Sequence, residues 1–103
     1  VWDGASGEWL EVLKGHTSSV CAVVCYSVEK VPRIASGSGD RTIRLWNWRR
    51  GRRGARRVAT LRGHKAAVWA LSTFSVDLNT RIASGSQDRT VRIWNGVGGT
   101  SQL

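Results

Sequence analysis

The chain repeats itself, and this repetition limits the available folds more than any other feature. Residues 15–47 align with residues 63–95 without a gap, and by direct count 18 of the 33 positions are identical. Equivalent residues lie 48 positions apart, so that Trp46 corresponds to Trp94. A repeat of this length is typical of small structural units that bury their apolar surface against a neighbouring unit. We therefore expect two copies of one such unit within the 103 residues.

Each unit is predicted to consist of short strands. The mostly apolar runs at residues 20–26 and 68–74 suit strands that are covered on both faces. Asp40 and Asp88 lie between later strand candidates, where a tight hairpin turn is expected. Four short strands in a period of 48 residues predict an antiparallel sheet that is repeated radially. The expected strands are residues 9–13, 20–26, 33–38, 42–47, 58–61, 68–74, 81–86 and 90–95.

A Gly-His pair, a Ser-Gly-Ser tripeptide, an Asp and a closing Trp-Asn recur at the same spacing in both units. Together these features resemble the WD-repeat β-propeller family. The resemblance extends from Val1 to Asn95, and Val1-Trp2-Asp3 is similar to the end of a preceding repeat. Both complete repeats end in Trp-Asn, a common substitution for Trp-Asp in that family. The resemblance implies an all-β fold of four-stranded antiparallel blades, in an incomplete ring of about two blades.

The resemblance also sets the expected organisation of the chain. Closed propellers have about four to eight blades, so two blades need further blades from a longer parent chain or from self-assembly. The strand expected at residues 9–13 would supply the outer strand missing after Asn95, in the same ring or in another copy. Because the chain starts at Val1 rather than Met, we expect a processed chain or a fragment. The expected units are residues 1–14 (the end of a preceding repeat and an outer strand), 15–62 (the first complete repeat, with an inserted linker at 48–57), 63–95 (a second repeat without its outer strand) and 96–103 (a Gly-rich tail).

Each unit carries one His, one Ser, one Asp and one Trp at matching positions. Ser, His and Asp are the components of a nucleophilic triad, but a catalytic set is usually built once, whereas this set recurs together with a Trp that can only donate. The resemblance implies a structural chain of hydrogen bonds from Trp to Ser, from Ser to His and from His to Asp. We therefore expect no catalytic residue and a structural network of His16, Ser36, Asp40 and Trp46 in the first unit and His64, Ser84, Asp88 and Trp94 in the second.

The resemblance further implies where a partner protein would bind. The family often binds on its narrower top face, three and five residues after the Gly-His histidine and just before the turn Asp. Trp69 is the strongest candidate, because Trp is enriched among the residues that dominate interface energies. Packing between blades is the alternative role for this side chain. The expected protein-binding positions are Ser19, Cys21, Gly39, Ala67, Trp69 and Gln87.

Most of the excess positive charge lies in one linker. The net charge of +9 falls to +3 when the six arginines within residues 48–57 are left out. Arginines beside glycines and Trp48 suit contact with RNA or another polyanion. The same run suits an acidic protein surface, a basic nuclear address or a solvated loop between strands. The six residues are Arg49, Arg50, Arg52, Arg53, Arg56 and Arg57.

Residues 46–49 resemble the Trp-Asp-x-Arg box of propellers that act as substrate receptors of cullin ubiquitin ligases. Here the box reads Trp46-Asn47-Trp48-Arg49, and it occurs in one repeat only. Propellers of this family are usually rigid interaction platforms. We therefore expect a non-catalytic scaffold for protein–protein interaction, with polyanion binding through residues 49–57 and a ligase substrate receptor as the alternatives.

Cys21 and Cys25 are not expected to pair. Four residues of extended strand span about 13 Å, whereas the Cα atoms of a disulfide lie about 4.4–6.8 Å apart. We expect two small buried apolar residues instead, and a reducing intracellular compartment, cytoplasmic or nuclear. No second Cys/His pair has the spacing of metal ligands, and the Gly-rich segments lack the setting of a phosphate loop. We therefore expect no metal, no cofactor and no membrane contact.

Overall fold

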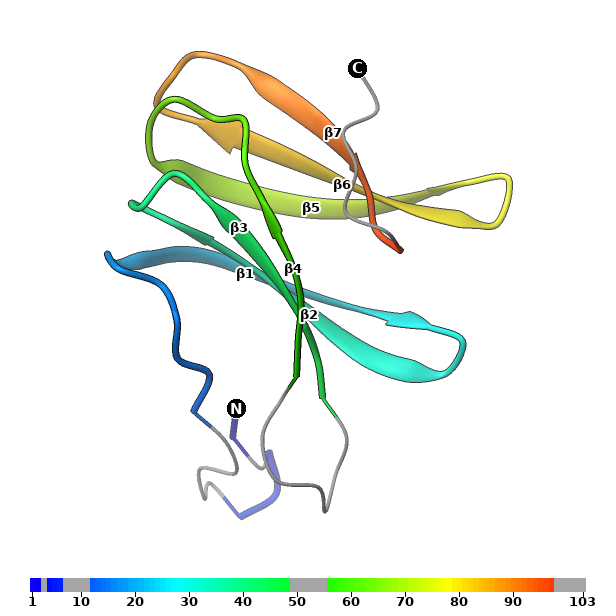
Figure 1. Ribbon diagram of the computed structural model, residues 1–103. Helices are drawn as coiled ribbons and strands as arrows, with labels where there is room; N and C mark the ends of the chain where they lie inside the picture. Colours follow the sequence, from blue (N-terminus) through cyan, green and yellow to red (C-terminus); the bar gives the residue numbers. More distant parts are fainter. Residues whose placement is uncertain (3, 7–11, 49–55, 98–103) are drawn as a thin grey trace.

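The computed structural model describes residues 1–2, 4–6, 12–48 and 56–97. Within these residues the chain forms seven strands and no helix (Figure 1). The described residues therefore contain no helix that is long and apolar enough to cross a membrane. The strands form two antiparallel sheets, which confirms the predicted all-β class. The first sheet contains β1 (Val20–Val28), β2 (Val31–Ser38), β3 (Ile43–Asn47) and β4 (Arg56–Leu61), and the second contains β5 (Val68–Val76), β6 (Asn79–Ser86) and β7 (Val91–Asn95).

In each sheet, every strand pairs with the next strand along the chain. The turn between β2 and β3 places Arg41 at a φ of 74°, and its N–H donates to the Ser38 carbonyl at 3.2 Å. Arg89 has a φ of 72° in the equivalent turn between β6 and β7. A left-handed residue at this place is typical of short hairpin loops whose twist matches that of the flanking strands. The two sheets therefore share one local geometry, as their shared sequence predicts.

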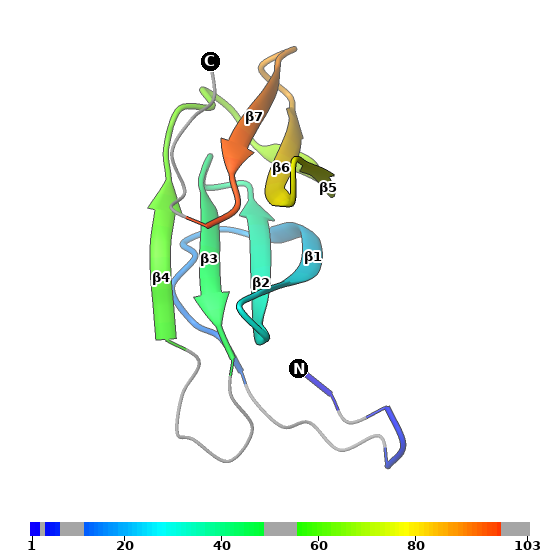
Figure 2. The ribbon, with the colours of Figure 1, turned by 90° about the vertical axis from the view of Figure 1, so that its right-hand side faces the viewer.

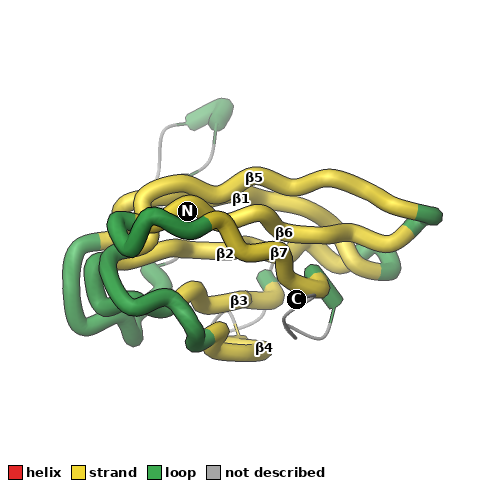
Figure 3. The backbone as a smooth tube through the Cα atoms, turned by 90° about the horizontal axis from the view of Figure 1, so that it is seen from above, coloured by secondary structure: helices red, strands yellow, loops and turns green. Residues whose placement is uncertain are grey.

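The two sheets pack face to face, with β1 beside β5 at the same edge (Figures 2 and 3). Side chains of both sheets form a single core between them. Burial of this apolar surface is the main force that holds the sheets together. The core residues are Ala35, Ile43, Leu45 and Leu61 from the first sheet and Val68, Ile82 and Trp94 from the second.

Each sheet buries one face and leaves the other uncovered. Val68 of the second sheet is 0 % exposed, whereas its equivalent Val20 in the first sheet is 52 % exposed. The reverse holds for the other face, since Ile43 is 0 % exposed and its equivalent Val91 is 65 % exposed. The described residues therefore form an open pair of sheets rather than a closed ring.

The inserted linker is shorter than predicted. Arg56 and Arg57 belong to β4, where they pair with Asn47 and Trp46 of β3. Strand pairing uses the backbone, so the two arginines extend β4 by two residues beyond the apolar run at 58–61.

The predicted burial of the two cysteines and the predicted strand at residues 9–13 can also be compared with the structure. The expectation that Cys21 and Cys25 are buried is wrong, because both are exposed and unpaired. Cys25 lies on the face of the first sheet that no other sheet covers, beside Val20 and Val23. Of the strand predicted at residues 9–13, residues 9–11 lie outside the described part, and Val12 and Leu13 are not in a strand.

Candidate functional site

A chain of hydrogen bonds joins the four signature side chains of the first repeat. The Trp46 indole Nε1 donates to Ser36 Oγ at 2.9 Å, and Ser36 Oγ lies 2.7 Å from His16 Nε2. His16 Nδ1 lies 2.8 Å from Asp40 Oδ2. Because an indole only donates and a carboxylate only accepts, Trp46 donates to Ser36 and His16 donates to Asp40.

The second repeat contains the same chain with almost the same lengths. Trp94 Nε1 donates to Ser84 Oγ at 2.8 Å, His64 Nε2 lies 2.6 Å from that oxygen, and His64 Nδ1 lies 2.8 Å from Asp88 Oδ2. The four side chains come from the segment before β5, from β6, from the β6–β7 turn and from β7. The chain of bonds therefore ties together parts of the sheet that are distant in sequence.

A threonine in each repeat belongs to the network and was missed by the sequence analysis. The Thr42 backbone N–H donates to Asp40 Oδ1 at 2.9 Å, and its hydroxyl donates to the same oxygen. Thr90 binds Asp88 in the same way. The signal was present in the sequence, because Asp-Arg-Thr follows Ser-Gly-Ser at identical spacing in both repeats.

These bonds determine the ionisation of the two aspartates. Burial alone would raise the pKa of Asp40, but hydrogen bonds from the Thr42 hydroxyl, from His16 and from backbone N–H groups outweigh it and hold the pKa well below its usual value of 3.8. The Thr90 hydroxyl is the main cause of the lowered pKa of Asp88. Both carboxyl groups are therefore negatively charged acceptors at neutral pH.

The glycine before each histidine allows a close approach to the network. Gly63 has a φ of +158°, and a Cβ added there would lie 3.2 Å from Trp94 Cη2 and 3.1 Å from Arg92 Nη1. At Gly15 the corresponding distance to Arg44 Nη1 is 2.9 Å. A side chain at either position would therefore displace an indole or a guanidinium group.

The Ser-His-Asp geometry is that of a hydrolytic triad, but its surroundings are those of a packed core. Ser84 is 0 % exposed and its oxygen is already bound by both Trp94 and His64. Ser36 borders a cavity of about 470 Å³, which lies on the face that the first sheet leaves open. The first sheet covers the equivalent Ser84 of the second sheet, whereas no described sheet covers the face on which Ser36 lies.

The expected binding positions lie at the open ends of the β1–β2 and β5–β6 hairpins, opposite their turns. The Gly39 N–H donates to the Ser19 carbonyl at 2.9 Å, and the Gln87 N–H donates to the Ala67 carbonyl at 3.0 Å. Each pair of expected positions is therefore joined by a backbone hydrogen bond.

A β-bulge adds the third position to each pair. The pairing register shifts between Val20 and Ala22 and between Val68 and Ala70, which leaves Cys21 and Trp69 as the extra residues. Bulges commonly redirect a side chain next to a functional site. Trp69 is 57 % exposed at this place.

Neither neighbouring sheet covers the bulge position. Cys21 is exposed although the second sheet covers one side of the first, and Trp69 is exposed although the first sheet covers the other side of the second. The bulge residue is therefore exposed in each of the two described sheets. Packing between the two described sheets therefore does not bury Trp69.

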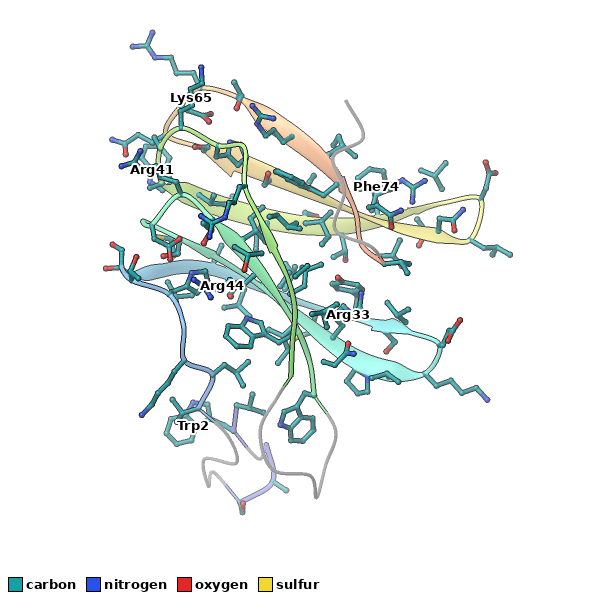
Figure 4. All side chains as sticks on the ribbon, viewed as in Figure 1. Trp2, Arg33, Arg41, Arg44, Lys65 and Phe74 are labelled. Atoms are coloured by element: carbon teal, nitrogen blue, oxygen red, sulfur yellow. The ribbon has the colours of Figure 1, made fainter. Side chains whose placement is uncertain are left out.

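Exposed cations surround this end of the molecule. Figure 4 shows Arg41 and Lys65 at the same end, away from Arg33 and Phe74. Arg41, Lys65 and Arg89 are all exposed, and these three cations outnumber the negatively charged Asp40 and Asp88 nearby. The surface around Trp69 is therefore basic.

A second polar cluster, which the sequence analysis missed, joins the two sheets. Arg33 is 7 % exposed, and its Nη1 donates to the carbonyls of Gly96 at 2.9 Å and Val97 at 2.7 Å. The Tyr26 hydroxyl donates to the same Gly96 carbonyl at 2.7 Å. Burial raises the pKa of Tyr26, although the Arg33 cation opposes this effect. Arg33 recurs as Arg81 in the alignment, which was the available signal.

The arginine linker and the ligase-like box are only partly described. Arg49, Arg50, Arg52 and Arg53 lie outside the described residues, and the side chains of Arg56 and Arg57 are likewise not described. In the described part of the box, the Trp46 indole donates to Ser36 within the hydrogen-bond network. Asn47 Oδ1 accepts a hydrogen bond from Arg33 Nε at 2.9 Å. Over the described residues, no group of His, Cys, Asp and Glu side chains has the arrangement of a metal site.

Comparison with known proteins agrees with this geometry. The WD40 family model, described as "WD domain, G-beta repeat", matches residues 7–47 and 55–95. Both matches contain a complete network, and together they cover most of the chain. A search of the curated proteins found no match. The chain belongs to the WD40 repeat family.

Proposed function

We propose that this chain is a non-catalytic module that binds another protein at the end of the sheets where Trp69 is exposed. WD40 repeats generally mediate protein–protein interaction, which supports the general class of function. The observation that carries the proposal is the exposed Trp69 at a β-bulge, in a position that neither sheet covers. An exposed Trp of this kind is a large, rigid contact that often dominates the energy of an interface.

The charges around Trp69 define the class of partner. Arg41, Lys65 and Arg89 are exposed at the same end, and these three cations outnumber the two negatively charged aspartates of the network. A complementary partner therefore presents an apolar side chain for Trp69 within an acidic surface. Electrostatic complementarity of this kind accelerates association and excludes basic partners.

A displayed library of random peptides tests this proposal. We expect selection on the wild-type chain to enrich acidic peptides with an apolar residue, and Trp69→Ala to weaken their binding at least about tenfold. Raising the salt concentration weakens binding further, because the cations are exposed.

Trp2→Ala is the matched control, since Trp2 is 69 % exposed at a different place and its loss leaves binding unchanged. Thermal unfolding shows whether Trp69→Ala remains folded, as expected for an exposed side chain. Peptides that bind wild type and Trp69→Ala equally well would overturn the proposal.

Polyanion binding through residues 49–57 is the alternative function, and it rests on the six arginines of that segment. Binding to RNA would weaken steeply with salt, because each neutralised phosphate releases counterions. An electrophoretic shift assay at two salt concentrations, with the six arginines neutralised as the control, distinguishes it from protein binding. A shift that disappears in the control variant would favour this alternative.

A further inference from the structure

We propose that the two open faces of this chain bind each other in trans, so that a second copy places its first sheet on the second sheet of the first copy. This assembly is separate from the partner binding proposed for Trp69. It would use the same contacts that already join the two sheets within one chain. The contacts between the first and second sheets therefore serve as the template for the contacts between copies.

Within one chain, the close contact in this template depends on a glycine. A Cβ added to Gly37 of β2 would lie 2.7 Å from Val68 Cγ1, so the absence of a side chain at Gly37 makes room for Val68. Val68 and Ile82 are both 0 % exposed as a result. The packed face of the first sheet is thus shaped to receive a valine.

The open face of the second sheet carries the equivalent glycine, and no described sheet covers it. Gly85 is the equivalent of Gly37, and the nearest atom to an added Cβ is Ala70 Cβ, at 3.8 Å. Val91 and Phe74, the equivalents of Ile43 and Tyr26, are 65 % and 40 % exposed. The space beside Gly85 therefore remains open in a single chain.

The open face of the first sheet carries the side chains that would fill this space. Val20 is the equivalent of Val68, and it is 52 % exposed, while the adjacent Val23 is 58 % exposed. Both valines and Ile34 line the cavity of about 470 Å³ that lies on this face. Placing Val20 of one copy against Gly85 of another would repeat the contact between Val68 and Gly37.

A hydrogen bond from Arg81 would add a polar contact between the two copies. Arg33 donates to the Gly96 carbonyl, and its equivalent Arg81 has only a long bond of 3.5 Å, to the Thr80 carbonyl, among the described residues. Trp48 is the equivalent of Gly96. Its N–H donates to the Pro32 carbonyl at 3.0 Å, as that of Gly96 does to the Thr80 carbonyl at 2.9 Å, so the two backbones have the same local arrangement. Arg81 would therefore donate to the Trp48 carbonyl of the second copy.

The free edge of β7 agrees with the same arrangement. In the first sheet, Leu61 of β4 pairs with Ile43 of β3. The described part of the second sheet ends at β7, beyond which no fourth strand pairs. Leu13 is the equivalent of Leu61 and borders the open face of the first sheet. Docking in trans would bring Leu13 of the second copy to the edge of β7, opposite Val91.

Because the two open faces differ, the contact is head to tail rather than between identical surfaces. Head-to-tail contacts produce closed rings when the rotation between subunits closes. Propellers have about four to eight blades, so a ring of two-sheet chains would contain about two to four copies. The expected assembly is thus a small oligomer of defined size.

Light scattering on the size-separated chain tests the proposal. We expect wild type at a whole-number multiple, two or more, of 11.3 kDa. Val20→Asp or Val91→Asp should each reduce the mass to that of one chain, because either places a charge in the apolar contact. Leu78→Asp is the matched control, since Leu78 is 101 % exposed in the β5–β6 turn and its replacement should leave the mass unchanged.

Mixing the two face variants distinguishes head-to-tail contact from any symmetric contact. A Val20→Asp chain keeps an intact second sheet, and a Val91→Asp chain keeps an intact first sheet. An equimolar mixture should therefore form a dimer with one copy of each variant. If the single variants are unfolded, the mixture should recover the β-sheet circular dichroism signal. A monomeric wild type, or a mixture that neither dimerises nor refolds, would overturn the proposal.

Discussion

At the scale of single residues, a repeated set of polar side chains serves as structural support. Ser84 is wholly buried between Trp94 and His64, so each member of the network satisfies another that is shielded from water. Removing one member leaves its partners without a bond in a place that water does not reach. The network should therefore contribute to stability in both repeats.

His64→Ala tests this role directly. Two hydrogen bonds are lost, each worth about 0.5–1.5 kcal/mol, and a loss of about 1 kcal/mol lowers the melting temperature of a chain this size by about 4–8 °C. We expect calorimetry to show a decrease of at least about 4 °C. Lys65→Ala is the control, because Lys65 binds Asp88 through its backbone N–H. An unchanged melting temperature for His64→Ala would contradict a stabilising network.

The lowered pKa of Asp40 makes a prediction about acid. A carboxyl group with a lower pKa in the folded state stabilises that state above its unfolded pKa and loses this contribution as the pH falls toward the folded pKa. We expect the urea midpoint of unfolding to decrease below a pH of about 3.8, the usual value for this group. Asp40→Asn should reduce this decrease, because the variant cannot titrate there. Parallel curves for the two proteins between about pH 5 and about pH 2 would contradict the prediction.

The repetition explains which residues could be predicted from the sequence. His16, Ser36, Asp40 and Trp46 could be singled out because each recurs 48 residues later. The roles of Thr42 and Arg33 depend on three-dimensional proximity instead. Arg33 binds carbonyl oxygens that lie 63 and 64 residues away, and a carbonyl carries no sequence signal.

At the scale of strands, side-chain patterns predicted the middle of each element better than its ends. The predicted run at residues 20–26 continues to Val28 in β1, and β4 begins at Arg56 although its apolar run begins at Val58. Both extensions come from backbone pairing, which does not depend on side-chain polarity. The bulge at Trp69 likewise belongs to the backbone, and so the exposure of this side chain could not be derived from its residue type.

Gly37→Val tests the close packing of β2 in the first sheet against Val68 of the second sheet. The new side chain would collide with Val68, so we expect a loss of stability of about 1–3 kcal/mol, the usual cost of overpacking. Urea unfolding measures this difference. Gly4→Val is the control, because no atom lies within 4 Å of a Cβ added at Gly4. Equal midpoints for Gly37→Val and wild type would show that the two sheets pack less closely than described.

At the scale of the whole molecule, each sheet of the pair has one covered and one open face. The repeated sequence predicted two sheets built from equivalent residues. The residues do correspond, but equivalent side chains differ in exposure, as Val20 and Val68 do. This difference explains why Cys25 is exposed, since it lies on an open face. The position of a repeat in the array, rather than its residues, decides which of its apolar side chains meet water.

The bond between Arg33 and the residues after β7 has a consequence for synthesis on the ribosome. β1 and β2 are translated before the carbonyls that Arg33 binds, which belong to Gly96 and Val97 after β7. Until then the Arg33 guanidinium group lacks these two acceptors, although its Nε can already donate to Asn47 Oδ1 of the same sheet. These two bonds can therefore form only after residues 96 and 97 have been translated, so this contact between the sheets is made once both repeats have left the ribosome.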